Sequence, residues 1–168
     1  MTENYSPNPA NNNNFLVTIS GAGVTVNYWA RSVTFPAVTM PGADMNYQNK
    51  QFSVPSNTRG KDDLNIEFIL EERLKNFKFF RRWMKKGLYG DGPIHECLLD
   101  ISVFLLDSNK QPIDEMKYKG SFPTNISNLT FEHGIIDANP MTFNVGFQFM
   151  EEVLGEDDGG DPWGEGRV

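Results

Sequence analysis

The chain has 168 residues, a formal net charge of −7 and a single cysteine. This length suits one domain with a substantial core, and no apolar run approaches the ~18 residues that a membrane-spanning helix needs. One cysteine excludes an internal disulfide framework and fits assembly in a reducing cytosol. Met1–Asn14 is polar and rich in asparagine, without the features of a secretory signal, and is expected to be a flexible arm.

Alternating apolar residues predict strands through the first third of the chain. The expected strands are Phe15–Ser20, Val24–Arg31 with an extended continuation to Phe35, and Gln48–Val54. Ala37–Asn46 is expected to be an irregular connection. The polar loop Asn57–Asp63 follows, between two strong strands, where long loops tend to be functional. Its residues are Asn57, Thr58, Arg59, Gly60, Lys61, Asp62 and Asp63.

The stretch after this loop organises the chain. Leu64–Leu70 alternates apolar and polar residues, which predicts a strand with one face on a core. The period then changes to that of a helix over Glu71–Lys86, with acidic residues in its first turn and basic ones in its last. Its core-facing stripe is expected to be Leu74, Phe77, Phe80, Trp83 and Met84.

The remaining elements are strand-like. The expected strands are Leu98–Leu106, apolar on both faces, then Ile113–Lys119, Ile126–Glu132 after a corner at Phe122–Asn125, and Thr142–Met150. The predicted fold is therefore mainly β: an antiparallel β-sandwich or half-open barrel with one amphipathic α-helix covering a face or an end. One domain is expected over residues 15–154, followed by an acidic, glycine-rich tail at 155–168.

Charge is distributed unevenly. The helical segment holds seven basic and two acidic residues, which leaves eight basic and twenty acidic residues in the rest of the chain. The basic face expected to point outward is Lys78, Arg81, Arg82, Lys85 and Lys86. It is either an ordinary solvated helix face or a docking surface for an acidic partner. Nucleic-acid binding is the weaker alternative, because an acidic body repels phosphate.

Catalytic and metal-binding patterns are weak. His95 and Cys97 could be two metal ligands, but the paired spacing of a zinc site is missing. Cys97 with His133 has no sign of an activated thiol, and the acidic run from Asp157 to Asp161 lacks the spacing of an EF-hand. No catalytic residue, cofactor or metal is expected, and the sequence favours a structural or interaction protein over an enzyme.

Three blocks of sequence together resemble the tail tube proteins of contractile-tailed bacteriophages. The first is Asn14–Ile19, followed by Val33–Pro36 and Met40–Gly42. The second is the strand Leu64–Leu70 with the aromatic helix segment Asn76–Met84. The third is Tyr118–Ile126, then Leu129 and the alternating strand Thr142–Met150. The resemblance covers roughly residues 14–152.

The resemblance implies subunits that form hexameric rings, stacked into a tube whose sheets join into one β-barrel around a lumen. The implied partners are other copies of the chain, the tail sheath protein, baseplate and tail terminator proteins, and tape measure protein and DNA in the lumen, with no membrane partner. The implied location is the virion tail, assembled in the host cytoplasm. A polar strand face, Thr142, Asn144 and Gln148, could then line the lumen, and the polar loop Asn57–Asp63 is expected to project and to contact the next stacked ring.

Other functions stay open at this point. The same fold could serve as a baseplate tube initiator, a tube terminator, or the tube of a phage-derived injection device. A small β-sandwich carbohydrate-binding module is the alternative from a different class. Such a module usually exposes tryptophans on a sheet face, whereas Trp83 and Trp163 lie on the helix stripe and in the tail, leaving only Trp29.

Overall fold

The computed structural model describes residues 14–22, 29–48, 50–55, 60–90, 92–133 and 139–155. Most of the expected N-terminal arm, part of the expected strand Val24–Arg31, residues 57–59 of the polar loop and all of 156–168 lie outside these described residues.

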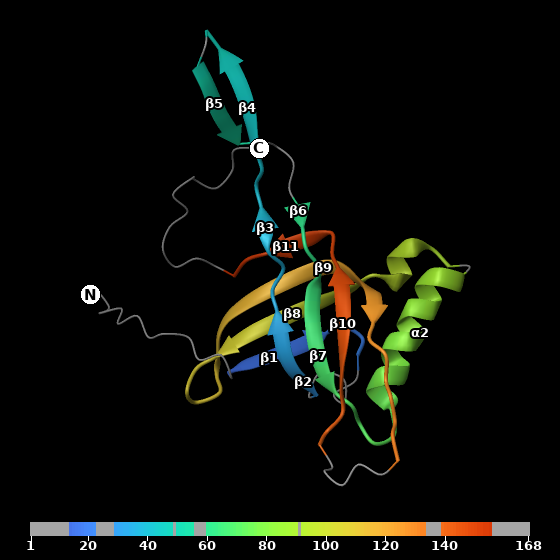
Figure 1. The fold of residues 1–168 in the computed structure, drawn as a ribbon. Coiled ribbons are helices and arrows are strands. Elements are labelled where there is room, and N and C mark those ends of the chain that lie inside the picture. Colours follow the sequence, from blue (N-terminus) through green and yellow to red (C-terminus); the bar gives the residue numbers. More distant parts are fainter. Residues whose placement is uncertain are drawn as a thin grey trace.

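Antiparallel strands form the body, in two sheets that share one long strand, β9 (Figure 1). The first sheet contains β1 (Phe15–Ile19), β8 (Leu99–Leu106), the first part of β9 (Pro112–Ile126) and β11 (Glu151–Val153). The second contains β2 (Ala30–Thr34), β7 (Leu64–Ile69), β10 (Thr142–Gln148) and the last part of β9. The mainly β, antiparallel fold predicted from the sequence is confirmed.

The shared strand bends where the sequence predicted a break. Ile113–Lys119 and Ile126–Glu132 were expected to be separate strands, but β9 is continuous to Ile126 and residues 127–133 contain no strand. Gly120 adopts φ +63°, a conformation that glycine reaches without steric cost, and its N–H donates to Asp100 Oδ1 at 3.1 Å. Pro123 lies at a register shift against β10, where a missing N–H is tolerated. The chain therefore changes direction without leaving the sheets.

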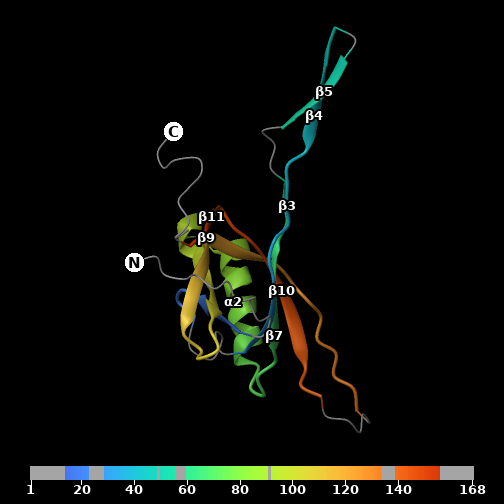
Figure 2. The same ribbon diagram turned by 90° about the vertical axis from the view of Figure 1, so that its left-hand side faces the viewer.

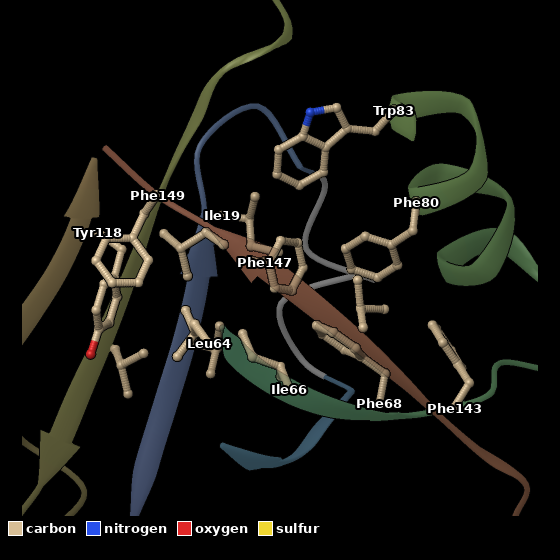
Figure 3. Packing of buried hydrophobic residues seen from close by; sticks show 14 residues of the cluster. Ile19, Leu64, Ile66, Phe68, Phe80, Trp83, Tyr118, Phe143, Phe147 and Phe149 are labelled. Carbon is tan, nitrogen blue, oxygen red and sulfur yellow. The ribbon is translucent and has the colours of Figure 1, made fainter. Parts of the chain in front are cut away.

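The core lies between the two sheets and is closed on one side by the helix (Figure 3). The alternation predicted for two strands is confirmed, because every second residue of β7 and β10 is buried: Leu64, Ile66, Phe68, Phe143, Val145 and Phe147. β8 is buried on both faces around Ile101–Val103, as its apolar sequence predicted. Phe80 of the helix lies at the centre, with its ring centroid 4.7 Å from that of Phe68 and 5.9 Å from that of Phe147.

The helix α2 spans Lys75–Tyr89, shifted by several residues from the predicted Glu71–Lys86. Leu74 has a left-handed backbone (φ 57°) and interrupts the helical path, so the two glutamates before it lie in a turn and not in the first helical turn. Gly87 lies inside the helix on an open surface and does not end it. Gly90 is the C-terminal cap, and its N–H donates to Lys86 O at 3.0 Å.

A buried side chain, Asn76, fixes the connection between β7 and α2. Its Nδ2 donates to Ile69 O at 2.7 Å, and its Oδ1 accepts from the N–H of Glu71 at 3.3 Å. The amide thus satisfies backbone groups that the tight strand-to-helix turn would leave without partners. The sequence pattern alone predicts only a helical position for this residue.

We expect Asn76→Ala to lower the free energy of unfolding by about 1–3 kcal/mol, because buried polar backbone groups lose their partner. Asn76→Asp is the matched control: it keeps the acceptor oxygens but removes the donor to Ile69 O, and should also destabilise. Urea denaturation followed by circular dichroism measures both. A midpoint for Asn76→Ala equal to that of the unchanged chain would contradict this role.

Two further contacts position the C-terminal half of the helix. Trp83 Nε1 donates to Cys97 O at 2.7 Å, which ties α2 to the short 3-10 helix η1 (Ile94–Cys97). Lys86 Nζ lies 3.5 Å from Glu96 Oε2 in the same element. The connection that follows the helix is therefore held against its C-terminal half.

Away from the helix, Tyr118 of β9 is buried in the core beside Phe149, with ring centroids 4.8 Å apart. Burial raises the pKa of the Tyr118 phenol above its ordinary value of 10.0, and the charge of Glu152 adds to this effect. The hydroxyl is therefore protonated throughout the neutral range, and β9 carries no charge into the core at this position.

Candidate assembly surfaces

An arm of paired strands extends from the second sheet (Figures 1 and 2). At its base, β3 (Val38–Thr39) pairs with β6 (Gly60–Lys61). Beyond them, β4 (Gly42–Tyr47) and β5 (Lys50–Pro55) form an antiparallel hairpin. These strands replace the irregular connection predicted for Ala37–Asn46. An isolated two-stranded hairpin is marginally stable in water, and every residue of β4 is exposed in the subunit.

The hairpin has one apolar and one polar face. Met45 lies directly opposite Phe52, and Ala43 opposite Val54, so their side chains share a face. On that face Met45 is 58% exposed, Tyr47 67% and Phe52 51%. On the other face, the Asp44 carboxylate accepts hydrogen bonds from Gln51 Nε2 at 2.9 Å and Ser53 Oγ at 2.6 Å. This arrangement is typical of a strand pair that covers an apolar surface on another molecule.

The arm was not predicted from the sequence, although the sequence contains a signal for it. Ala43, Met45 and Tyr47 alternate with polar residues, and Phe52 and Val54 repeat the pattern beyond a short polar stretch. Of the loop Asn57–Asp63, which we expected to project and to contact the next ring, only the part from Gly60 to Asp63 is described. Residues 57–59 are outside the described residues, Gly60 and Lys61 form β6 at the base, and Asp63 Oδ2 accepts a hydrogen bond from Thr124 Oγ1 at 2.9 Å.

The residues predicted to form the core-facing stripe of the helix differ in how deeply they are buried. Phe80 and Trp83 are buried, while Phe77 and Met84 are half-buried. Leu74 is half-buried and precedes the helix. Phe79, which is not part of the predicted stripe, packs against the core with its ring centroid 5.4 Å from that of Phe80.

The predicted basic face is exposed along the helix: Lys78, Arg81, Arg82, Lys85 and Lys86. The Arg81 guanidinium carbon lies 5.2 Å from the centre of the Phe77 ring, and Lys86 pairs with Glu96. Within the part of the chain that the structure describes, no ion pair involves Lys78, Arg82 or Lys85. Three cations are thus available to an acidic partner.

The predicted lumen-facing residues share β10 with the core residues but point the other way. Asn144 and Gln148 are exposed, and Thr142 is half-buried. Asn144 lies opposite Glu67 of β7, which accepts a hydrogen bond from Ser32 Oγ at 3.2 Å. Because Phe143 and Phe147 point towards Phe80, this polar face of the second sheet lies on the side away from α2.

The sheets also end in open edges. In the strand order β1-β8-β9-β10-β7-β2, the outer strands β1 and β2 each have a neighbour on one side only among the described residues. Unpaired edge groups favour pairing with another chain. The subunit therefore offers three kinds of surface for assembly: open edges, an amphipathic arm and a basic helix face.

The residues considered for chemistry lie in different environments. His95 and His133 are exposed, and Cys97 is half-buried with its carbonyl bonded to Trp83. Among the described residues, no three His, Cys, Asp or Glu side chains gather as a metal site. Nor does any described helix have the length and apolar character needed to cross a membrane. The acidic run from Asp157 to Asp161 is outside the described residues.

Comparison with known proteins identifies solved structures that share this fold. No protein-family model and no curated protein matches the sequence. Among solved structures, a chain of the anti-feeding prophage tube-terminating cap is 11% identical with TM-score 0.65, covering 89% of this chain and 92% of that chain.

Two further structures extend the likeness. A chain of the PVC sheath–tube complex, from an extracellular contractile injection system in its extended state, is 12% identical with TM-score 0.61 and covers 87% of this chain and 90% of that chain. Hcp1 from Flavobacterium johnsoniae is 15% identical with TM-score 0.52, covering 84% of this chain and 94% of that chain. The chain therefore has the tail tube fold found in contractile injection systems, as its resemblance to tail tube proteins predicted.

Proposed function

We propose that the chain is a structural subunit whose copies join into hexameric rings, and that the rings stack into the inner tube of a contractile phage tail. The observation that carries this proposal is the amphipathic arm, which exposes Met45, Tyr47 and Phe52 away from a body with open sheet edges. Apolar surface of this kind is stabilised by burial against a neighbouring copy. Pairing of the edge strands would close the sheets into a ring and remove the open edges.

The arm and the adjoining loop Asn57–Asp63 make the contacts between rings in this proposal. The arm extends well beyond the body (Figure 2), so it can reach a copy in the next ring while the sheet edges contact copies in the same ring. In this proposal the arm joins neighbouring rings, and the sheet edges join subunits within one ring.

The lumen is assigned to the polar face of the second sheet, with Thr142, Asn144 and Gln148. Because this face and α2 lie on opposite sides of the sheet, a lumen on one side puts the helix outside. The lumen would then carry polar groups and the Glu67 carboxylate, which lies 3.6 Å from the Arg31 guanidinium, so this face would not attract phosphate strongly and would let DNA pass. Tape measure protein would occupy the same lumen in this proposal.

The basic helix face then points towards a surrounding sheath protein. Lys78, Arg82 and Lys85 would pair with acidic sheath residues, and exposed ion pairs are individually weak, at about 0–1 kcal/mol each. Such contacts break readily when a sheath contracts. Baseplate and tail terminator proteins would complete the two ends of the tube.

Negative-stain electron microscopy of the purified full chain, over a range of concentrations, tests the proposal. Rings or tubes with a central hole are the expected result, and a monodisperse monomer at every concentration would contradict it. A structure of the assembled tube tests the orientation separately. A lumen lined by Arg81 and Lys85 would overturn the outward helix while leaving the tube assignment intact.

A second candidate is the tube of a phage-derived injection device, or its initiator or terminator. The likeness to chains of the anti-feeding prophage cap and the PVC sheath–tube complex favours it. The neighbouring genes distinguish the two candidates: capsid genes support a phage tail, whereas toxin genes support an injection device.

A further inference from the structure

A groove runs along the C-terminal half of α2, between the helix, η1 and the bend of β9. It consists of two adjoining hollows of about 550 and 560 Å³, which share Met84, Leu88 and Thr124. Sites that hold small molecules in proteins have volumes of about 300–1,000 Å³. Each hollow is therefore large enough to take part in binding a small molecule.

The first of these, the apolar hollow, reaches the edge of the packed core. Trp83 lines it and is only 6% exposed, whereas Ile94 and Met150 line it and are more than half exposed. The hydrogen bond from Trp83 to the Cys97 carbonyl holds η1 against α2 at this place. The apolar hollow therefore exists in the free subunit before any ligand binds, as is usual for small-molecule sites.

The second, the cationic hollow, selects strongly by charge. Four cations line it beside Met84 and Leu88: Lys78, Arg81, Arg82 and Lys85. Among the described residues, no aspartate or glutamate lines either hollow, although the chain carries a net charge of −7. Arg82 and Lys85 also have no acidic partner in the part of the chain that the structure describes. The groove therefore complements a molecule that is anionic at one end and apolar along the rest.

We propose that the groove binds a single-chain amphiphile with an anionic head group, namely a carboxylate on a medium or long acyl chain. The carboxylate lies between Arg82 and Lys85, and the acyl chain passes Leu88 into the apolar hollow. Arg82 and Leu88 are six residues apart, which is about 9 Å along a helix. An acid of only a few carbons is too short to use both hollows. This ligand goes beyond the proposed tube role and does not depend on it, because a single subunit supplies the whole site.

An acidic protein segment is the other occupant that these cations could attract. Such a segment carries backbone N–H and C=O groups that need hydrogen-bond partners when they are buried. The apolar hollow is lined mainly by apolar side chains, which offer few partners but suit an acyl chain. A bound amphiphile would also occupy Arg82 and Lys85, which the proposed function assigns to the sheath, and would compete with sheath docking.

A fluorescence titration tests the ligand class. The probe is dansylaminoundecanoate, used below its micelle concentration with the full chain, and its uncharged methyl ester is the control probe. We expect saturable binding of the carboxylate, and binding of the ester that is weaker by about tenfold or more, because hydrogen bonds to a charged group are lost. Equal binding of the two probes would contradict the proposal.

Matched variants test the place of binding. Arg82→Glu/Lys85→Glu should weaken carboxylate binding by about tenfold or more. Arg73→Glu/Lys75→Glu is the control, because it changes the net charge equally at exposed positions that line neither hollow. Leu88→Glu, at a residue that is 68% exposed, should also weaken binding without unfolding the chain. Equal weakening in Arg73→Glu/Lys75→Glu would overturn the proposed site.

Two further measurements exclude other sources of the signal. Removing the apolar face of the arm with Met45→Ser/Phe52→Ser should leave the affinity for the carboxylate unchanged, and loss of binding would show that the arm is the site. A synthetic amphipathic peptide of glutamate and leucine that binds the groove, while the carboxylate does not, would make the groove a protein-docking site and overturn the proposal. All proteins are compared in fractions of the same assembly state. The result is therefore independent of whether electron microscopy shows tubes.

Discussion

Replacing Phe80 by alanine is expected to lower the free energy of unfolding by about 3–5 kcal/mol, the cost of removing a buried phenylalanine from a packed core. Phe80 is fully buried and lies within aromatic contact distance of Phe68, Phe143 and Phe147, from both principal strands of the second sheet. The cavity would open where α2 closes the core. Because native domains are stable by only about 5–15 kcal/mol, this single change could remove much of the stability of the subunit.

Phe77→Ala is the matched control for this experiment. The residue lies one turn earlier on the same helix and is half-buried, with one ring contact to Phe143 at 5.4 Å. Urea denaturation under conditions that keep the chain monomeric should give a clearly smaller loss for Phe77→Ala. Equal losses would mean that the helix packs along its whole stripe and not mainly through Phe80.

The second large effect is expected on assembly. Met45→Ser/Phe52→Ser removes the facing apolar pair of the arm, and burial of each such side chain contributes about 1.5–3 kcal/mol. Each contact between copies should therefore weaken by about 3–6 kcal/mol, which is a hundredfold or more in dissociation constant. Tubes should disappear from electron micrographs at concentrations where the unchanged chain forms them.

The variant should fold normally, because both side chains are more than half exposed in the subunit. Its thermal unfolding midpoint, measured on the monomer, should equal that of the unchanged chain. Asn46→Ser/Gln51→Ser is the control, since these residues form the next facing pair on the polar side of the same hairpin. Tubes of normal abundance from Met45→Ser/Phe52→Ser, or equal loss in the control, would show that the apolar face is not the assembly contact.

Strong periodicity made much of the body predictable from the sequence. The strands β7 and β10 each bury every second residue in one core, and no local feature competes with that pattern. The start of α2 was not predictable in the same way. Two glutamates favour a helix N-terminus, but the buried amide of Asn76 stabilises a turn that delays it, and the partners of that amide are identified only once the chain is folded.

The arm was missed for a different physical reason. Its alternation resembles that of a core strand, yet neither face of β4 is buried in the subunit, so the core of the subunit does not explain the pattern. The bend in β9 was misjudged because glycine and proline usually end strands. Here Gly120 and Pro123 occupy a left-handed position and a register shift, where each is tolerated without loss of pairing.

The continuity of β9 has a mechanical consequence. Two sheets held together only by side chains can slide over one another, because such contacts re-form after small displacements. In this subunit a covalent backbone runs through both sheets, and the arm emerges from β2 and β7 in the sheet that receives the last part of that strand. A pull on the arm would therefore be transmitted along hydrogen-bonded ladders to β9, and through its backbone to β8 and β1. The body would move as a rigid block, and compliance would be confined to the narrow pairing of β3 with β6.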